Sequence, residues 1–320
     1  MAILVGIDEA GYGPVLGPLI VSATAWCVPD DEAEQCLWDR LRESVCRRPA
    51  RRDRRLPILD SKKLFHRKTG LAGLERSALT ALRLAGMEPA SFRDLLGRLC
   101  PDALAQLDLY PWYRDFHLDL PVSLEPGTLG TQANALRLDC TRQQVKLVGA
   151  FCEALPEGHF NRLVGNTRNK GVVLLGLVLR VLSRAMAAGG DQPVRVFVDR
   201  QGGRARYAPH LLTAFDGYDL QILEESPERS AYALRRKGGE VRVEFAVSGE
   251  DRHLPVALAS ILSKYLRELF MIGLNRYWAG RVPGLSPTAG YYTDGHRFLK
   301  DIAPALREAG VDRTLLVRAR

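Results

Sequence analysis

Two apolar segments open the chain, and a turn rich in glycine and proline separates them. Residues 2–7 and 18–28 are rich in Val, Ile and Leu, which favours buried strands. Residues 193–199 form a similar apolar run that ends in an aspartate. The pattern therefore predicts three buried strands, two of which end beside acidic residues.

Apolar positions at helical spacing predict two long helices. In residues 255–278 apolar side chains recur at helical spacing, and residues 160–187 begin with turn-forming residues and continue as a strongly apolar helix. Residues 30–56 favour a polar amphipathic helix followed by the very basic stretch CRRPARRDRR. We interpret that stretch as a solvated loop, with a phosphate-facing role as the alternative. Helix-start chemistry occurs at Asp60 and Ser61.

A hairpin and a short closing helix complete the predicted elements. The stretch SAYALRRKGGEVRVEFAVSG alternates in polarity around Lys237, Gly238 and Gly239, as a β-hairpin does. PGLSPTAGYYTDGH is typical of a loop. The longest apolar run, near GVVLLGLVLRVL, is interrupted by Arg180 and is too short to span a bilayer, so we expect no membrane association.

Composition and charge narrow the class of protein. The 320 residues are 46% hydrophobic and 26% charged, as in ordinary globular proteins. The formal net charge of +8 favours polyanionic partners. The six cysteines form no C-x-x-C pair, so we expect neither a zinc site nor disulfides, but reduced thiols in an intracellular protein. Asp8 and Glu9 interrupt the region where a signal peptide needs an apolar core, so we expect a cytoplasmic protein.

Asp8 and Glu9 stand between two apolar runs. Successive side chains of a regular strand point to opposite faces, so the two acids can reach one site only if the strand ends or distorts between them. Gly11 and Gly13 provide backbone freedom for such a distortion and room for a ligand. A dinucleotide-binding turn is excluded because Gly17 comes one residue too late and a strand-like segment follows. Solvent-facing acids at a strand end are the alternative.

Five stretches, in the same order, resemble the motifs of the type 2 ribonuclease H family. GIDEAGYGPVLGP (6–18) is similar to the family's first signature, G-I-D-E-A-G-R-G-P-x-x-G-P, and LDSKKL (59–64) to its D-S-K-K-L element. VFVD (196–199) resembles the strand that ends in the third acid. LPVALASILSKYLRE (254–268) and AGYYTDGH (289–296) resemble the A-A-A-S-I-L-A-K helix and the G-Y-G-T-x-x-H segment. The five together are far more specific than any one of them.

The resemblance implies an α/β protein with a ribonuclease-H-like fold, in which helices flank a mixed five-stranded sheet. Residues 1–320 are then a single catalytic domain. The unmatched residues 86–158 are interpreted as an inserted subdomain, and residues 280–320, approximately, as a C-terminal loop and helix extension.

The resemblance also implies four carboxylates that hold two divalent ions. The first three are Asp8, Glu9 and Asp199. The fourth position falls on Glu250, where glutamate is typical of the related type 3 enzymes, and neighbouring Asp251 is the alternative. Oxygen ligands suit Mg²⁺ or Mn²⁺, and two such ions can activate a water and stabilise the leaving oxygen. The ions would also relieve the repulsion between clustered anions.

Residues that contact the nucleic acid follow from the same resemblance. Tyr12 stands where the family has an arginine, so an arginine contact to phosphate is lost while backbone sensing of the 2′-hydroxyl can remain. Lys264 follows Ser260 by one helical turn, so both can face the substrate. The implied contacts are Gly11, Tyr12, Gly13, Lys62, Lys63, Lys264 and Tyr291.

Several other residues keep two interpretations. His296 is either involved in product release or proton transfer, or a structural loop histidine. Asn166 and Asn169 either line the nucleic-acid groove or act as turn and cap residues. An aromatic cluster is either a base-stacking platform or the core of the inserted subdomain: Trp112, Tyr113 and Phe116.

The function implied by the resemblance is endonucleolytic hydrolysis of the RNA strand of RNA–DNA hybrids, or cleavage at ribonucleotides embedded in duplex DNA. We expect a monomer that depends on Mg²⁺ or Mn²⁺ and leaves 5′-phosphate ends. Two alternatives are a nuclease of the same fold with another nucleic-acid substrate, and a non-catalytic protein that binds nucleic acid.

Overall fold

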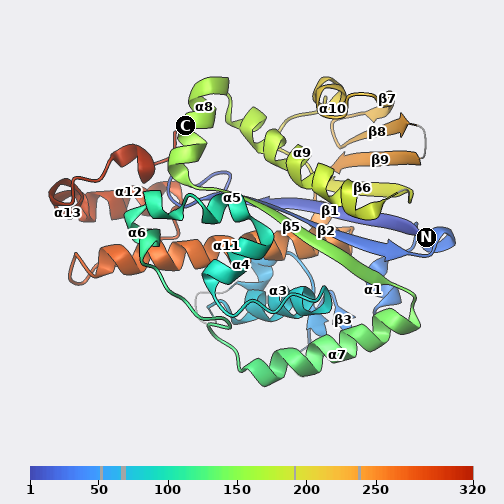
Figure 1. The fold of residues 1–320 in the computed structure, drawn as a ribbon, viewed down its shortest axis with the longest axis horizontal. Helices are drawn as coiled ribbons and strands as arrows, with labels where there is room; N and C mark the ends of the chain where they lie inside the picture. The colour runs from blue at the N-terminus through green and yellow to red at the C-terminus, as the bar shows by residue number, and fades with distance from the viewer. Residues whose placement is uncertain (51–52, 66–69, 191, 237–238, 320) are drawn as a thin grey trace.

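A seven-stranded sheet of mixed direction runs through the middle of the computed structural model (Figure 1). The structure describes residues 1–319 except 51–52, 66–69, 191 and 237–238. The sheet order is β5–β2–β1–β6–β9–β8–β7. The strands are β1 (Ala2–Ala10), β2 (Leu19–Val28), β5 (Lys146–Leu155), β6 (Val194–Asp199), β7 (Asp219–Glu225), β8 (Arg229–Arg236) and β9 (Gly239–Ala246), and a separate parallel pair consists of β3 (Val45–Cys46) and β4 (Leu56–Pro57).

Helices follow and separate these strands. The α-helices are α1 (Leu37–Arg40), α2 (Ser61–Leu64), α3 (Ala72–Leu84), α4 (Phe92–Leu99), α5 (Pro101–Leu104), α6 (Pro111–Arg114), α7 (Pro126–Arg142), α8 (Glu157–Thr167), α9 (Lys170–Gly189), α10 (Ala208–Ala214), α11 (Leu254–Ala279), α12 (Tyr292–Asp301) and α13 (Ala303–Glu308). Short 3₁₀ helices are η1 (Asp30–Glu32), η2 (Leu107–Leu109), η3 (Gly249–Asp251) and η4 (Arg313–Leu315).

The three central strands run parallel, and this brings their carboxyl ends to one edge of the sheet. β1 pairs in parallel with β6, and β6 pairs in parallel with β9, whereas the remaining pairings are antiparallel. The last paired residues of β1 and β6 are Ile7 and Val198, so Asp8 and Asp199 come next on neighbouring strands. Parallel strands in the middle of a sheet are covered on both faces, which explains their continuous apolar sequences.

Each face of the sheet has its own hydrophobic core. Figure 1 shows α9 on one side and α11, with α3 and α4, on the other. Alternate residues of β1 divide between the two cores: Ile3, Val5 and Ile7 pack with α9, whereas Ala2 and Leu4 pack with the α11 side. α11 is almost wholly buried, which follows from its nearly uniform apolar sequence.

Sequence cues account for several helix starts. The Asp60 side chain accepts a hydrogen bond from the Lys62 backbone N–H at 2.9 Å and caps α2, as predicted for residues 60 and 61. Asn169 caps α9 by accepting from the backbone N–H groups of Gly171 (2.9 Å) and Val172 (3.3 Å). Asn169 therefore acts as a cap residue, one of the two interpretations given to it.

The structure corrects part of the predicted architecture. The α/β class and the mixed sheet are confirmed, but the sheet has seven strands and not five. The amphipathic helix predicted at the start of residues 30–56 is wrong, since the described residues of this segment, which exclude 51–52, contain only η1, the four-residue α1 and parts of the short strands β3 and β4. The predicted hairpin is confirmed by the antiparallel pairing of β8 with β9, while residues 237 and 238 of its turn lie outside the described residues.

The segment interpreted as an insertion contributes to the main sheet. Residues 146–155 form β5, which pairs with β2, so the boundary at 158 is wrong because the last part of the segment is a strand of the central sheet. Trp112 and Tyr113 are buried and pack edge-on or tilted against aromatic rings of α11, including Phe270 and Trp278. These rings are therefore core residues and are not exposed for base stacking.

The single helix predicted over 160–187 is divided into α8 and α9, and the apolar run lies in α9. Helix α9 has 20 residues and a mean hydropathy of 1.8 in its most apolar window, which by length and composition alone is enough to cross a membrane. The expectation that this run is too short is thus wrong. Its buried residues, such as Leu174, Val178 and Leu182, pack against the sheet as part of the α9-side core.

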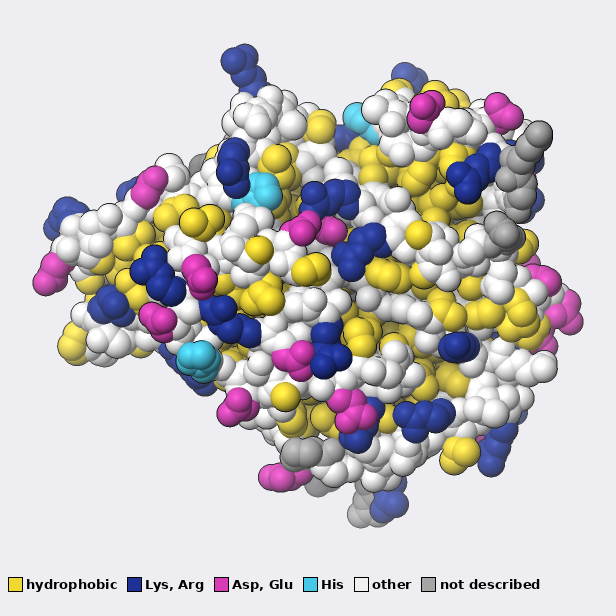
Figure 2. All heavy atoms as spheres, viewed as in Figure 1, with side chains coloured by type: hydrophobic (Ala, Val, Ile, Leu, Met, Phe, Trp, Pro, Cys, Tyr) yellow, Lys and Arg dark blue, Asp and Glu magenta, His cyan; other side chains and the backbone are white. Residues whose placement is uncertain are grey.

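Charged side chains are mixed on the molecular face drawn in Figure 2. Lysine and arginine are spread over this whole view, with acidic side chains among them. The net charge of +8 therefore forms no single basic patch on this face. A surface that binds a polyanion must therefore be identified from the charged residues that line a particular groove.

Candidate active site

Asp8 and Asp199 lie on neighbouring parallel strands at the carboxyl edge of the sheet. Asp8 is buried, and the charge of Asp199 acts on it strongly enough to raise the pKa of its carboxyl group. The strand register explains the approach, because each aspartate directly follows a paired residue. Two acids separated by 190 positions in the sequence thus meet at one point.

Glu9 joins them although β1 does not end after Asp8. The strand continues to Ala10 and pairs with β2 through Glu9 and Val21, so the expected break between the two acids is absent. The Glu9 backbone N–H donates to the Asp8 carboxylate at 2.7 Å. Repulsion by Asp199 contributes to the raised pKa of Glu9, so both neighbouring acids feel the same third carboxylate.

Glu250 approaches from η3, directly after β9. The backbone N–H of Gly249 donates to Asp199 at 2.9 Å, and the side chains of Asp199 and Glu250 are hydrogen-bonded to each other. Ser248 has a left-handed φ of 57°, which turns the chain from β9 into this short helix. Asp8, Glu9, Asp199 and Glu250 are called the acid cluster below.

The pKa values of all four carboxyl groups in the acid cluster are raised, as expected for acids that are buried close together. Burial is the first cause and repulsion the second for the raised pKa of Asp8. The same two causes raise the pKa of Glu9 to about 7, and those of Asp199 and Glu250 are raised chiefly by burial. Without a cation, such groups hold their protons to a higher pH than isolated carboxyl groups do.

The acid cluster is not arranged as a finished metal site. Among the residues that the structure describes, no three His, Cys, Asp or Glu side chains are positioned to hold one ion as they stand. Asp199 and Glu250 interact with each other instead, and Oε2 of Glu250 is buried without a hydrogen-bond partner. The cluster therefore supplies oxygen ligands that need a cation to draw them together.

Asp251, the alternative fourth acid, has a different environment. Its carboxylate is 56% exposed and lies 3.6 Å from Nζ of Lys63, which is also 3.8 Å from Asp60. Lys62, by contrast, lies near enough to the acid cluster for its charge to lower the pKa values of Glu9 and Asp199. Of the two lysines, Lys62 lies near the cluster and Lys63 is paired with Asp60 and Asp251.

Serine hydroxyls of α11 hold Asp8 in place. Ser263 donates to the Asp8 backbone carbonyl at 3.0 Å and lies 2.8 Å from the hydroxyl of Ser22 on β2. Hydrogen bonding by Ser260 opposes the rise in the Asp8 pKa, and the Ser260 hydroxyl also lies 3.0 Å from that of Ser61 on α2. Serines on α11, β2 and α2 thus connect the acid to its surroundings.

Lys264 is engaged away from these serines. Its ammonium group lies 2.6 Å from Glu268 and 4.9 Å from the ring centre of Phe65. Only 13% of its side chain is exposed, so the expected approach to a substrate would first require the Glu268 pair to open.

The turn after β1, residues 11–17, is called the glycine turn. Gly11 has φ of 89°, and a Cβ there would overlap the Pro18 carbonyl, so only glycine fits. Beside Gly13 there is open space. Tyr12 is half-buried, with Nζ of Lys170 lying 5.1 Å from its ring centre, and burial and the charge of Glu9 raise its pKa.

Two buried ionisable residues, Arg318 and Glu157, bind the backbone of the glycine turn. The sequence analysis did not identify either of them. Arg318 donates hydrogen bonds to the carbonyl oxygens of Gly11 and Tyr12, and Glu157 accepts one from the Gly17 N–H at 2.9 Å. Arg318 comes from the last residues of the chain and Glu157 from the start of α8. No local spacing signals either contact, because both partners are distant in sequence.

Tyr291 reaches the same region from the C-terminal segment. The Gly290 carbonyl accepts from the N–H groups of Val15 (2.8 Å) and Leu16 (3.2 Å), which docks the segment on the glycine turn. Tyr291 is 51% exposed, with the Arg267 guanidinium 5.6 Å from its ring centre.

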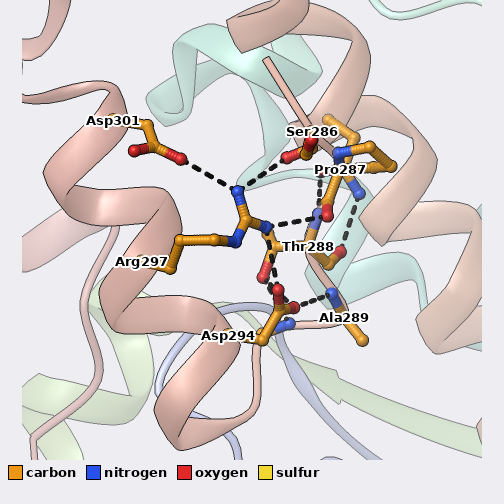
Figure 3. Close-up of polar contacts among 9 residues, drawn as sticks. Ser286, Pro287, Thr288, Ala289, Asp294, Arg297 and Asp301 are labelled. Atoms are coloured by element: carbon orange, nitrogen blue, oxygen red, sulfur yellow. Dashed lines mark hydrogen bonds and ion pairs between the residues drawn. The ribbon is translucent and has the colours of Figure 1, made fainter.

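A polar network keeps this segment in shape (Figure 3). Asp294 accepts from the Thr288 hydroxyl at 2.6 Å and from the Ala289 N–H at 2.8 Å. Arg297 contacts Asp294, Asp301 and the carbonyls of residues 286 and 287. His296 packs on Tyr292 with ring centres 4.6 Å apart.

Comparison with known proteins matches a part of this chain to a ribonuclease. A stretch of 65 residues is 38% identical to ribonuclease HII of Roseiflexus castenholzii, which is 20% of this chain and 28% of that protein. This stretch makes the chain a distant relative of ribonuclease HII. The family resemblance of the sequence is thereby confirmed. A search of family models finds none that matches.

Solved structures of such enzymes are similar at low identity. The ribonuclease HII of Archaeoglobus fulgidus, solved as a complex with PCNA, is 15% identical with a TM-score of 0.44, over 99% of this chain and 94% of that one. A Bst ribonuclease HIII in complex with Mn²⁺ is 14% identical with a TM-score of 0.44, over 99% and 66%. Ribonuclease H2 of Pyrococcus horikoshii is 14% identical with a TM-score of 0.42, over 98% and 92%.

Proposed function

We propose that this relative of ribonuclease HII is a metal-dependent endonuclease. Its substrate is the RNA strand of RNA–DNA hybrids, or a ribonucleotide embedded in duplex DNA, and its products carry 5′-phosphate and 3′-hydroxyl ends. The observation that carries the proposal is the meeting of Asp8, Glu9, Asp199 and Glu250 at one sheet edge. The 38% identical stretch of ribonuclease HII supports the reaction class.

The acid cluster fits a pair of divalent cations by its chemistry. It offers only carboxylate oxygens, which suit Mg²⁺ or Mn²⁺ better than softer metals. The buried, unpartnered Oε2 of Glu250 is an available ligand atom. When bound, two such ions supply an activated water and charge stabilisation for the leaving oxygen. Asp8, Glu9, Asp199 and Glu250 are the residues that would hold them.

The chain's own residues would orient the substrate around this centre. The open space at Gly13 lets a sugar–phosphate backbone come close to the main chain, where the 2′-hydroxyl can be sensed. Lys62, beside Glu9 and Asp199, adds positive charge near the reacting phosphate. Tyr12 in the glycine turn and the exposed Tyr291, which follows the docked Gly290, would border the substrate.

Three matched duplexes test the proposal: an RNA–DNA hybrid, a DNA duplex with one ribonucleotide, and an all-DNA duplex. With Mg²⁺ or Mn²⁺, we expect cleavage of the first two only. Asp199→Asn should lower the rate at least ~100-fold, because metal-bound charge stabilisation contributes several kcal/mol to the transition state. Asp219→Asn, an exposed acid at the start of β7, is the control and should keep full activity.

The outcomes separate the proposal from its alternatives. Equal cleavage of all-DNA duplex would favour a nuclease with another substrate, which is motivated by Tyr12 in place of the family arginine. Binding of hybrid without cleavage in either metal would favour a non-catalytic protein. Glu250→Gln should be as harmful as Asp199→Asn, and Asp251→Asn much less so, because Asp251 is exposed and paired with Lys63.

A further inference from the structure

A groove runs from the acid cluster toward the basic stretch that the sequence left unassigned. Its volume is about 830 Å³, and it lies between α1, the β3–β4 pair, α2 and η3. Lys63, Glu250 and Asp251 line the end nearest the acid cluster. The charged residues that line the rest are one acid, Asp39, and four arginines: Arg42, Arg47, Arg48 and Arg55. A polymer that enters the acid cluster can therefore continue along the same hollow.

We propose that this arginine groove binds the phosphate backbone of the nucleic acid beside the cleavage site. The inference rests on the proposed function, which supplies the identity of the polyanion. It gives Arg47 and Arg48 of the basic stretch CRRPARRDRR the phosphate-facing role rather than that of a solvated loop, while Arg51 and Arg52 of that stretch lie outside the described residues.

The four arginines of the groove differ in whether an acidic side chain already binds their guanidinium groups. Arg42, Arg47 and Arg48 are exposed, whereas Arg55 is held by Asp53 through contacts of 2.7 to 3.2 Å. Arg42 lies 3.6 Å from the exposed Glu43, a contact that solvent and salt screen. Three guanidinium groups are thus free to meet phosphates, and Arg55 shapes the groove.

The groove is built on a fixed framework. The Arg47 guanidinium lies 4.4 Å from the ring centre of Trp38, whose indole N–H donates to the Ile58 carbonyl at 2.8 Å. Ser44 binds the buried Asp139 through its backbone N–H at 3.0 Å and its hydroxyl at 2.6 Å. An arginine stacked on an anchored ring is preorganised for bidentate phosphate binding.

Backbone recognition fits this chemistry better than base recognition. Trp38 is buried beneath Arg47, so its ring is not offered to a base. Guanidinium groups that bind phosphates position a strand without reading its sequence. The groove therefore contributes affinity and register along the substrate, and it should act alike on hybrid and DNA duplexes.

Binding measured without catalysis tests the inference. We would replace Arg42, Arg47 and Arg48 by Gln in the full chain and measure anisotropy of a short labelled DNA duplex in EDTA, from about 50 to 200 mM salt. Each lost phosphate contact lowers the slope of log K against log salt by about 0.9, so the triple variant should lose about 2 to 3. With hybrid and metal, KM should rise while kcat stays unchanged.

A matched variant controls for net charge. Arg137, Arg281 and Arg307 are exposed and outside the groove, and Arg281 stacks on Tyr277 at 3.6 Å much as Arg47 stacks on Trp38. Replacing these three by Gln removes the same charge and should leave the salt slope close to that of the wild type. Equal losses in both triple variants would overturn the inference, because the effect would then be one of overall charge.

The result also separates this inference from the proposed function. If the wild type cuts hybrid but the groove variant keeps its salt slope and KM, the groove inference fails and the function stands. If the wild type cuts no duplex, but the salt slope of log K falls in the groove variant and not in the control variant, the proposed function fails and the groove inference stands. A wild type that does not bind duplex overturns the inference. A single Arg48→Glu variant, at an exposed position, repeats the test if the triple variant melts early.

Discussion

Arg318 and Glu157 are buried ionisable residues that both bind the glycine turn. Arg318 is 4% exposed, and burial lowers its pKa to about 10, while Glu157 is fully buried and burial raises its pKa to about 7. Each bonds the backbone of the glycine turn, Arg318 near its start and Glu157 at Gly17. Two residues outside the acid cluster thus fix the loop that follows β1.

Glu157 makes stability depend on pH in a defined direction. Its carboxyl titrates near 4.5 when unfolded and near 7 when folded, so the unfolded chain loses the proton first as pH rises. The contribution is complete below pH 4.5 and is lost on the way to pH 7. Glu157→Gln keeps an acceptor for Gly17 and should remove this loss, about 2 kcal/mol between pH 5 and 7.

Urea unfolding at pH 5 and pH 7 measures the difference. Wild-type protein should lose more stability between the two pH values than Glu157→Gln, while the exposed Glu228→Gln should behave like the wild type. An equal pH dependence in wild type and Glu157→Gln would show that the carboxyl of Glu157 ionises alike in both states.

At the scale of elements, the contact of α11 with β1 sets the position of the acid cluster. A Cβ on Gly6 of β1 would overlap backbone atoms of Pro255 and Val256 in the first turn of α11. Thr24 of β2 donates to the Pro255 carbonyl at 2.8 Å, which ties the same turn to the sheet. The helix therefore lies directly on the strand that carries Asp8, and glycine is required at the crossing.

Replacing this glycine should push the helix from the sheet. Gly6→Ala is expected to destabilise the protein by at least about 3 kcal/mol, the upper range for overpacking a core, because backbone atoms cannot move aside. Gly176→Ala, at an exposed position of α9 with open space around it, should instead stabilise by about 0.5 to 1 kcal/mol. Chemical denaturation of both variants checks this, and a neutral Gly6→Ala would refute the close approach.

Element prediction succeeded where one local signal dominated. The apolar runs of β1, β2 and β6 and the helical spacing of α11 identify these elements. β7 was missed because most of its residues are exposed, so its sequence DLQILEE lacks a buried face. β5 was missed because it lies in the region that matches none of the family's motifs. In the described sheet it is an edge strand that pairs with β2. The helix predicted within residues 30–56 was wrong because short strands and turns occupy the described part of this segment.

At the scale of the whole molecule, the site consists of segments that only the fold brings together. The motifs indicated which acids to compare, and the parallel pairing of β1 with β6 accounts for Asp8 and Asp199. The sequence favoured Glu250 over Asp251 as the fourth acid, and the structure adds that Glu250 is half-buried beside Asp199 whereas Asp251 is exposed. Contacts such as Arg318 with Gly11, 307 residues apart, have no sequence signal at all.

Metal binding should therefore act on the stability of the entire fold. The acid cluster holds mutually repelling carboxylates, so an ion that binds only the folded state adds stability, about 2.7 kcal/mol at a hundred times its Kd. For a protein of this size we expect Tm to rise by several degrees with Mn²⁺ or Mg²⁺.

Asp199→Asn removes one repelling charge and one ligand, so it should melt above the wild type in EDTA and below it in excess metal. Thermal melts at matched ionic strength measure this reversal, with Asp219→Asn as the variant that should follow the wild type. If Asp199→Asn and the wild type gain the same Tm from the metal, then Asp199 is not a ligand and the acid cluster does not form one site.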